Sequence, residues 1–149
     1  MRIFSCLLAL ILVAALAGCG GSDNTPTNVG LFGNWNVVTY PTGSQNPSYV
    51  FALALSQEGS NNYSGGSIVY DGGVAPPSGM CINANTLQAT ATTSGSNFTM
   101  TVTDTTTSTI IRITGTLTGG SESSISGNYS NDASPACSSS QGTVTMSAQ

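Results

Sequence analysis

NFTMTVTDT, residues 97–105, alternates apolar and polar side chains with a period of two residues. Successive side chains of a β-strand point to opposite faces, so this segment predicts a strand with two unlike faces. One face carries Phe98, Met100 and Val102, and the other carries Thr99, Thr101 and Thr103. An antiparallel sheet suits such a strand, because one of its faces can remain in water.

Seven further segments show the same alternation, and clusters of Gly, Asn, Asp and Ser separate them. They span residues 34–40, 49–56, 63–70, 86–93, 110–118, 124–130 and 142–148. We therefore expect an all-β fold of about eight strands, each with one wet face. Most connections have hairpin length, and closure into an antiparallel up-and-down barrel would remove exposed strand edges. A β-sandwich is the alternative, because it shows the same alternation.

Charged side chains are rare, at 5% of the residues, and the chain contains no histidine. Nucleic-acid binding is excluded, because phosphate contacts need several Lys or Arg side chains. Nucleophile–base pairs and zinc sites built on histidine or thiolate lack their residues. Asp71 and Asp104 are the nearest approach to a catalytic carboxylate pair, but both occupy turn positions where we expect solvated side chains. The sequence thus predicts a protein that is not an enzyme, with no metal site and no cofactor.

The first residues have the pattern of a secretory signal peptide. Arg2 precedes an apolar stretch, residues 3–17, which ends in the small residue Gly18 and Cys19. A basic start, an apolar block and a small-residue cleavage site are typical of such leaders. A membrane-spanning helix needs about 20 apolar residues, more than this block supplies. We expect residues 1–18 to be removed.

LAGC, residues 16–19, resembles the lipobox of bacterial lipoprotein precursors. The resemblance implies that the Cys19 thiol carries a diacylglycerol and that the new amino terminus is acylated. Gly20 in place of aspartate implies sorting to the outer membrane of a Gram-negative bacterium. Residues 19–30 are rich in Gly, Ser, Asn, Thr and Pro, a composition that stays extended and solvated as a tether. Residues 31–149 would form the β-barrel domain.

Two of the four cysteines remain for a disulfide. Cys6 leaves with the leader and Cys19 carries lipid, so an exported chain keeps Cys81 and Cys137. Paired cysteines are expected in an oxidising compartment. No CxxC spacing points to a redox-active pair. We predict a structural Cys81–Cys137 disulfide.

A second resemblance lies at the start of the first expected strand. Gly33-Asn34-Trp35, a Gly-x-Trp motif, resembles the opening of the lipocalins and of the related avidin-like barrels, the calycins. The resemblance implies an eight-stranded up-and-down barrel with Trp35 closing one end. Gly33 would let the backbone pass close to the indole ring.

Two functional hypotheses follow. The first is a lipid-anchored, non-enzymatic envelope protein with a structural or surface-interaction role, in which loops 41–48 and 71–85 or the Ser/Thr/Asn faces touch envelope components. The alternative is a lipocalin-like protein that binds a small apolar ligand in the barrel mouth. Its candidate ligand-binding residues are Trp35, Phe51, Leu53, Phe98, Met100, Ile111 and Tyr129. The same side chains can instead fill the barrel, because eight strands leave little interior room.

Overall fold

The computed structural model describes residues 28–149. The regular secondary structure of these residues consists of β-strands alone. Eight of them form one closed antiparallel barrel. They are β2 (Gly33–Pro41), β3 (Tyr49–Gln57), β4 (Asn62–Ile68), β5 (Leu87–Ser94), β6 (Asn97–Asp104), β7 (Ile110–Thr116), β9 (Ser124–Asn131) and β10 (Ser140–Ala148). Each pairs with the next of these strands along the chain, and β10 pairs with β2 to close the ring. The predicted up-and-down barrel is confirmed, and the sandwich alternative is not adopted.

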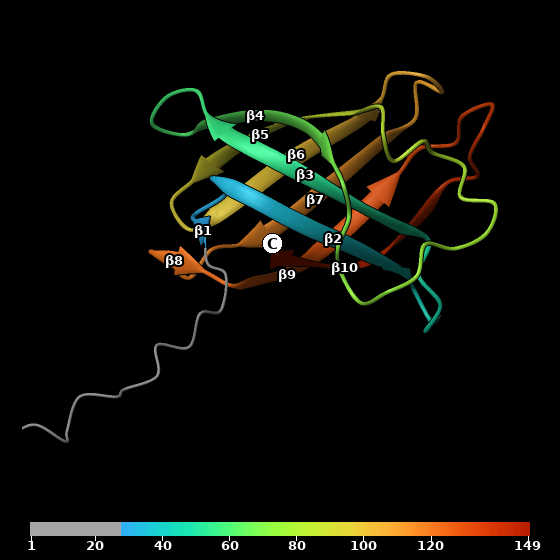
Figure 1. The fold of residues 1–149 in the computed structure, drawn as a ribbon, viewed down its shortest axis with the longest axis horizontal. Coiled ribbons are helices and arrows are strands. Elements are labelled where there is room, and N and C mark those ends of the chain that lie inside the picture. Colours follow the sequence, from blue (N-terminus) through green and yellow to red (C-terminus); the bar gives the residue numbers. More distant parts are fainter. Residues whose placement is uncertain (1–27) are drawn as a thin grey trace, which may run out of the picture.

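The two ends of the barrel differ (Figure 1). One end, which we call the β1 end, carries a small ribbon in which β1 (Asn28–Val29) pairs with β8 (Ser121–Glu122). At the opposite end, which we call the loop end, lie the longer connections, residues 42–48, 69–86, 105–109 and 132–139. The predicted leader, Cys19 and the tether up to residue 27 lie outside the described residues. Residues 28–149 contain no helix with the length and hydrophobicity needed to cross a bilayer.

The barrel interior is built from the apolar faces that the alternation predicted. In β6, Phe98, Met100 and Val102 are at most 3% exposed, whereas Thr99 between them is exposed. In β7, Ile111 and Ile113 point inward and Arg112 points outward, where it pairs with Asp132 at 2.6 Å. The largest side chains with less than 2% exposure are Trp35, Phe51, Leu31, Leu53, Met100, Ile111, Ile113 and Met146. They form one continuous hydrophobic core.

The β1 end is closed by the residues that lead into β2. The Leu31 side chain is fully buried, and its carbonyl accepts a hydrogen bond from the Trp35 indole N–H at 3.0 Å. Between them Gly33 has a φ of 130°, a conformation that side chains disfavour and that turns the chain sharply into the strand. Trp35 therefore lies beneath a plug made by its own upstream residues.

The outer wall departs from the expectation of one wet face per strand. Val38, Val50 and Ala52 point outward from β2 and β3 and are nevertheless buried. Residues 69–86, which we call the crossing segment, run from β4 across the outside of these strands before reaching β5 (Figure 1). The Met80 sulfur accepts a hydrogen bond from the Val50 N–H at 3.5 Å. The long connection thus shields apolar outward positions, and the expectation is wrong for this part of the wall.

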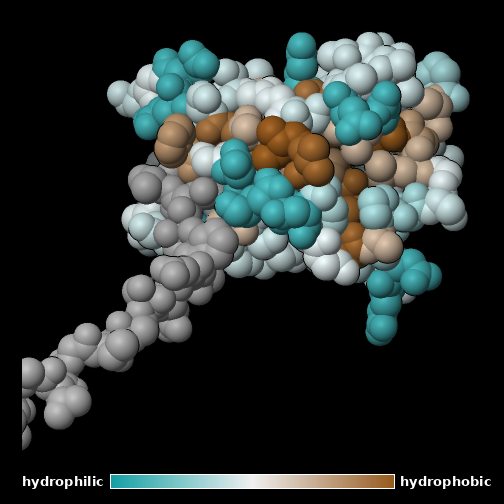
Figure 2. Space-filling view, in the orientation of Figure 1, coloured by the Kyte–Doolittle hydropathy of each residue, from teal (hydrophilic) through white to brown (hydrophobic). Residues whose placement is uncertain are grey.

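The crossing segment also leaves some apolar surface in water. Figure 2 shows hydrophobic side chains near the middle of this face, beside strongly hydrophilic ones. Val69, at the start of the segment, is 81% exposed. Close by, Asp71 bonds to Asn36 and the Val69 carbonyl accepts from Gln149 at 2.7 Å. Polar contacts therefore fasten the segment at its edge, while buried apolar groups lie beneath it.

The inside–outside alternation of β6 can be tested with neighbouring substitutions. Met100→Ala removes a fully buried side chain and leaves a cavity, so we expect a loss of about 2–5 kcal/mol in unfolding free energy. Thr99→Ala, at an exposed position, is the control and should change the stability by about 0.5 kcal/mol or less. Urea unfolding followed by Trp35 emission measures both. Equal losses would contradict the assignment of the faces.

Candidate functional site

The seven residues predicted to bind an apolar ligand all lie in the barrel core. Their exposed fractions are between 0% and 3%. Trp35, Phe51, Leu53 and Met100 retain no surface that a water molecule can touch, so their neighbours fill the space around them. The structure thus brings the predicted residues together as a packed interior.

A network of hydroxyl groups lies across the barrel mouth at the loop end. The Tyr129 hydroxyl bonds to Ser48 at 2.9 Å and to Ser140 at 3.2 Å, and Ser48 bonds in turn to Thr39 at 2.8 Å. The Tyr49 ring meets Tyr129 edge-on, with 6.0 Å between centroids. Burial raises the pKa of the Tyr49 hydroxyl from its ordinary value of 10.0, so this group stays neutral. The mouth is closed by neutral hydrogen bonds.

The predicted disulfide is confirmed. Cys81 in the crossing segment is bonded to Cys137 in the connection between β9 and β10. Cys137 is 4% exposed, and the Cys81 carbonyl lies 3.3 Å from its sulfur. The bond joins two loop-end connections across the barrel mouth. It holds the crossing segment against the core.

Asp104 is an anchor for the loops and not the solvated turn residue that its sequence position predicts. Its side chain is 1% exposed and accepts hydrogen bonds from the Asn83 and Thr106 N–H groups and the Thr86 and Thr107 hydroxyls, all at 2.8 Å. Burial alone would raise the pKa of this carboxyl, but these bonds outweigh it and hold the pKa far below the ordinary 3.8. The expectation of a solvated Asp104 is therefore wrong.

The other carboxylates also have structural partners. Exposed Asp71 accepts a bond from the Asn36 amide at 2.7 Å, so Asp71 and Asp104 belong to separate networks. Buried Glu122 accepts bonds from the Thr118 and Gly119 N–H groups at 2.7 and 3.0 Å. Within residues 28–149, no three His, Cys, Asp or Glu side chains are close enough to hold a metal ion. The arrangement gives these carboxylates a role in shaping turns.

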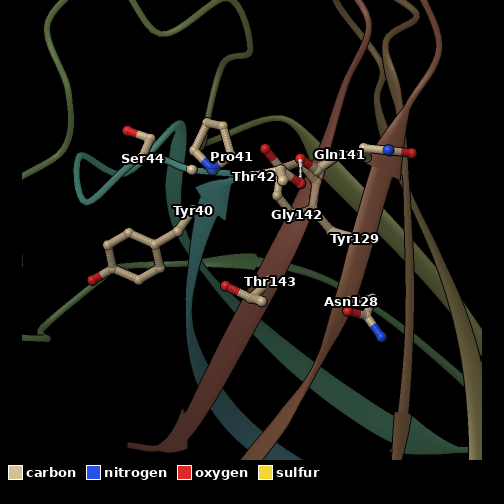
Figure 3. A pocket seen from close by; sticks show the side chains of 10 residues that line it. Tyr40, Pro41, Thr42, Ser44, Asn128, Tyr129, Gln141, Gly142 and Thr143 are labelled. Atoms are coloured by element: carbon tan, nitrogen blue, oxygen red, sulfur yellow. Dashed lines mark hydrogen bonds between the residues drawn. The ribbon is translucent and has the colours of Figure 1, made fainter.

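An open groove of about 460 Å³ lies on the outer wall at the loop end (Figure 3). It is formed by the ends of β2, β9 and β10 and by the turn after β2. Its lining consists of Tyr40, Pro41, Thr42, Gly43, Ser44, Asn128, Tyr129, Gln141, Gly142 and Thr143. The turn is fixed by a bond from the Thr42 hydroxyl to the Gln141 carbonyl at 3.1 Å. This lining contains hydroxyls, amides and tyrosine rings but no charged side chain.

The groove is the candidate site that sequence reasoning missed. The pairing that brings Asn128 beside Thr143 could not be seen from the alternation of apolar and polar residues. The chain matches no protein-family model, no curated protein and no solved structure. What the groove offers chemically is an aromatic face with neutral hydrogen-bond donors and acceptors.

The stabilising role of Asp104 predicts a dependence on acid pH. A carboxyl whose pKa is lowered by folding stabilises the fold above its unfolded pKa and loses this effect as the pH falls toward the folded pKa. At pH 7 we expect Asp104→Asn to cost about 2–4 kcal/mol, because buried N–H groups lose a charged acceptor. The difference from the wild type should shrink below about pH 4.

Chemical denaturation at pH 7 and pH 2.5 measures this effect. Asp71→Asn, which changes an exposed carboxylate, is the control and should remain near wild-type stability at both pH values. Equal stability of Asp104→Asn and the wild type at pH 7 would contradict the anchoring role.

Because side chains fill the barrel interior, we expect that apolar ligands do not bind there. Palmitate, a sterol, a quinone and biotin should leave both the emission of Trp35 and the melting temperature unchanged. Binding to the folded state would raise the melting temperature by mass action. A ligand that shifts both signals would show that the interior opens to admit it.

Proposed function

We propose that this protein is a lipid-anchored, non-enzymatic β-barrel of the bacterial cell envelope, held on the outer membrane through Cys19, with a structural or surface-interaction role. The observation that carries the proposal is the difference between the two ends of the barrel. The described chain begins at the β1 end, and the long connections lie at the opposite end (Figure 1). An anchor upstream of residue 28 would leave the loop end facing away from the membrane.

The chemistry of the described residues favours contact over catalysis. Asp104 and Glu122, two of the few acidic side chains, are buried acceptors for backbone N–H groups. The Cys81 and Cys137 sulfurs are joined to each other. These groups hold the loops in place, which suits a protein that presents a fixed surface.

The packed interior favours the interaction role over the ligand-binding alternative. The lipocalin-like hypothesis needs a cavity bordered by the seven core residues, and those with no exposed surface are packed on every side. Contacts with other envelope components would then be made by the loop end and by the hydroxyl-rich outer wall. The Gly-x-Trp resemblance supports a calycin-like barrel, used here as a scaffold.

The anchor can be tested by substituting Cys19. Cells that express the chain are fed a labelled fatty acid, and the purified protein is analysed for label and by mass spectrometry. We expect the wild type to carry label on a chain that starts at Cys19, and Cys19→Ser to carry none. Cys6→Ser, within the expected leader, is the matched control and should be labelled as strongly as the wild type. A mature wild-type chain with an intact, unmodified leader would refute the proposal.

A further inference from the structure

The groove at the loop end continues along the outer wall. A second hollow of about 350 Å³ lies between β6, β7 and β9, and Asn128 borders both hollows. Thr99 and Thr114 lie in its lining, as Tyr40 and Thr143 do in the first. The two hollows therefore meet at one exposed side chain in the middle strand.

Strand pairing aligns these residues in a single row. Tyr40 pairs with Thr143, Thr143 with Asn128, Asn128 with Thr114, and Thr114 with Thr99. We call this row the outer track. It crosses five adjacent strands, which at about 4.8 Å between strands makes it roughly 19 Å long. This length suits an extended chain of several units.

The outer track is preorganised and its polar groups are free. Among the described residues, none of its five side chains bonds to another group of the protein, although each has a donor and an acceptor. Threonine on a strand has few rotamers, so little side-chain entropy is lost when it binds. At one end, half-buried Tyr40 adds a flat apolar ring with a polar tip (Figure 3).

This chemistry selects among possible partners. An anionic polymer needs cations, and Arg112, the one cation among residues 28–149, is engaged by Asp132 at 2.6 Å. A stable protein interface needs a dry apolar centre, whereas the outer track has a single aromatic side chain. A chain of neutral sugars offers hydroxyls that both donate and accept, together with C–H faces that pack on an aromatic ring.

We propose that the outer track is a binding site for a neutral polysaccharide chain, with Asn128 shared between two adjacent subsites. This inference deepens the proposed function by naming the class of envelope component that is bound. Several weak contacts along one polymer act together, because the first raises the effective concentration for the next.

Affinity electrophoresis tests the site. The protein, solubilised in a polyoxyethylene detergent, migrates in native gels because its acidic side chains outnumber its basic ones. The gels contain dextran, laminarin or galactomannan as neutral polymers, and alginate as an anionic one. We expect retardation in at least one neutral gel and none in alginate. Asn128→Arg, which places a long cation across both subsites, should weaken the binding about tenfold or more.

The control is Ser124→Arg, which adds the same charge at an exposed position of the same strand, outside both hollows. It should be retarded like the wild type. Tyr40→Ala removes the aromatic face and should also weaken binding, which keeps the test valid if Asn128→Arg fails to show wild-type Trp35 emission. No retardation of the wild type in any neutral gel would overturn the proposal. Equal retardation of both arginine variants, or retardation by alginate, would overturn it as well.

The outcome is separate from that of the anchor test. Retardation is measured on purified protein and does not depend on acylation of Cys19. A wild-type protein that carries no label but is retarded would reject the anchor and keep the glycan site. A wild-type protein that carries label but is not retarded would keep the anchor and reject the glycan site.

Discussion

The pairing of β10 with β2 is the constraint on which the rest of the structure depends. It joins Met146 to Val37 and Val144 to Thr39, and it turns a meander of hairpins into a ring with an inside and an outside. An open sheet would expose two strand edges, which proteins commonly protect with charged side chains. This chain has few charges, so closure is its main protection against edge-to-edge association.

Because side chains fill the barrel interior, the groups that remain accessible to other molecules lie on the outer wall. The apolar side chains that a wider barrel would offer to a ligand here support one another, as the fully buried Phe51 and Met100 illustrate. The Asp104 carboxylate is also engaged within the protein, because it accepts hydrogen bonds from N–H groups of two different loops. What remains for recognition is a wall of short hydroxyl and amide side chains held in register by the strands. Binding to such a surface would depend on shape and hydrogen-bonding pattern and would be little affected by salt.

The strands and the interior could be predicted because period-two alternation is a local property. Residues 97–105 already showed which side of β6 faces inward, and cysteine counting paired Cys81 with Cys137. Alternation cannot show what returns to cover an outer face, so the burial of Val50 was missed. A turn position likewise says nothing about whether the N–H groups of another loop converge on Asp104. The candidate site was missed for the same reason, because its residues meet only through the register of a closed ring.

The disulfide gives the molecule a further property. Cys81 and Cys137 are 56 residues apart, and the covalent loop between them contains β5, β6, β7, β8 and β9. A protease that cuts any turn inside this loop, such as residues 105–109, produces two fragments that remain joined through sulfur. The nicked barrel keeps its strand pairing and cannot shed half of its wall. In surroundings rich in proteases, a single cleavage would therefore leave the molecule whole.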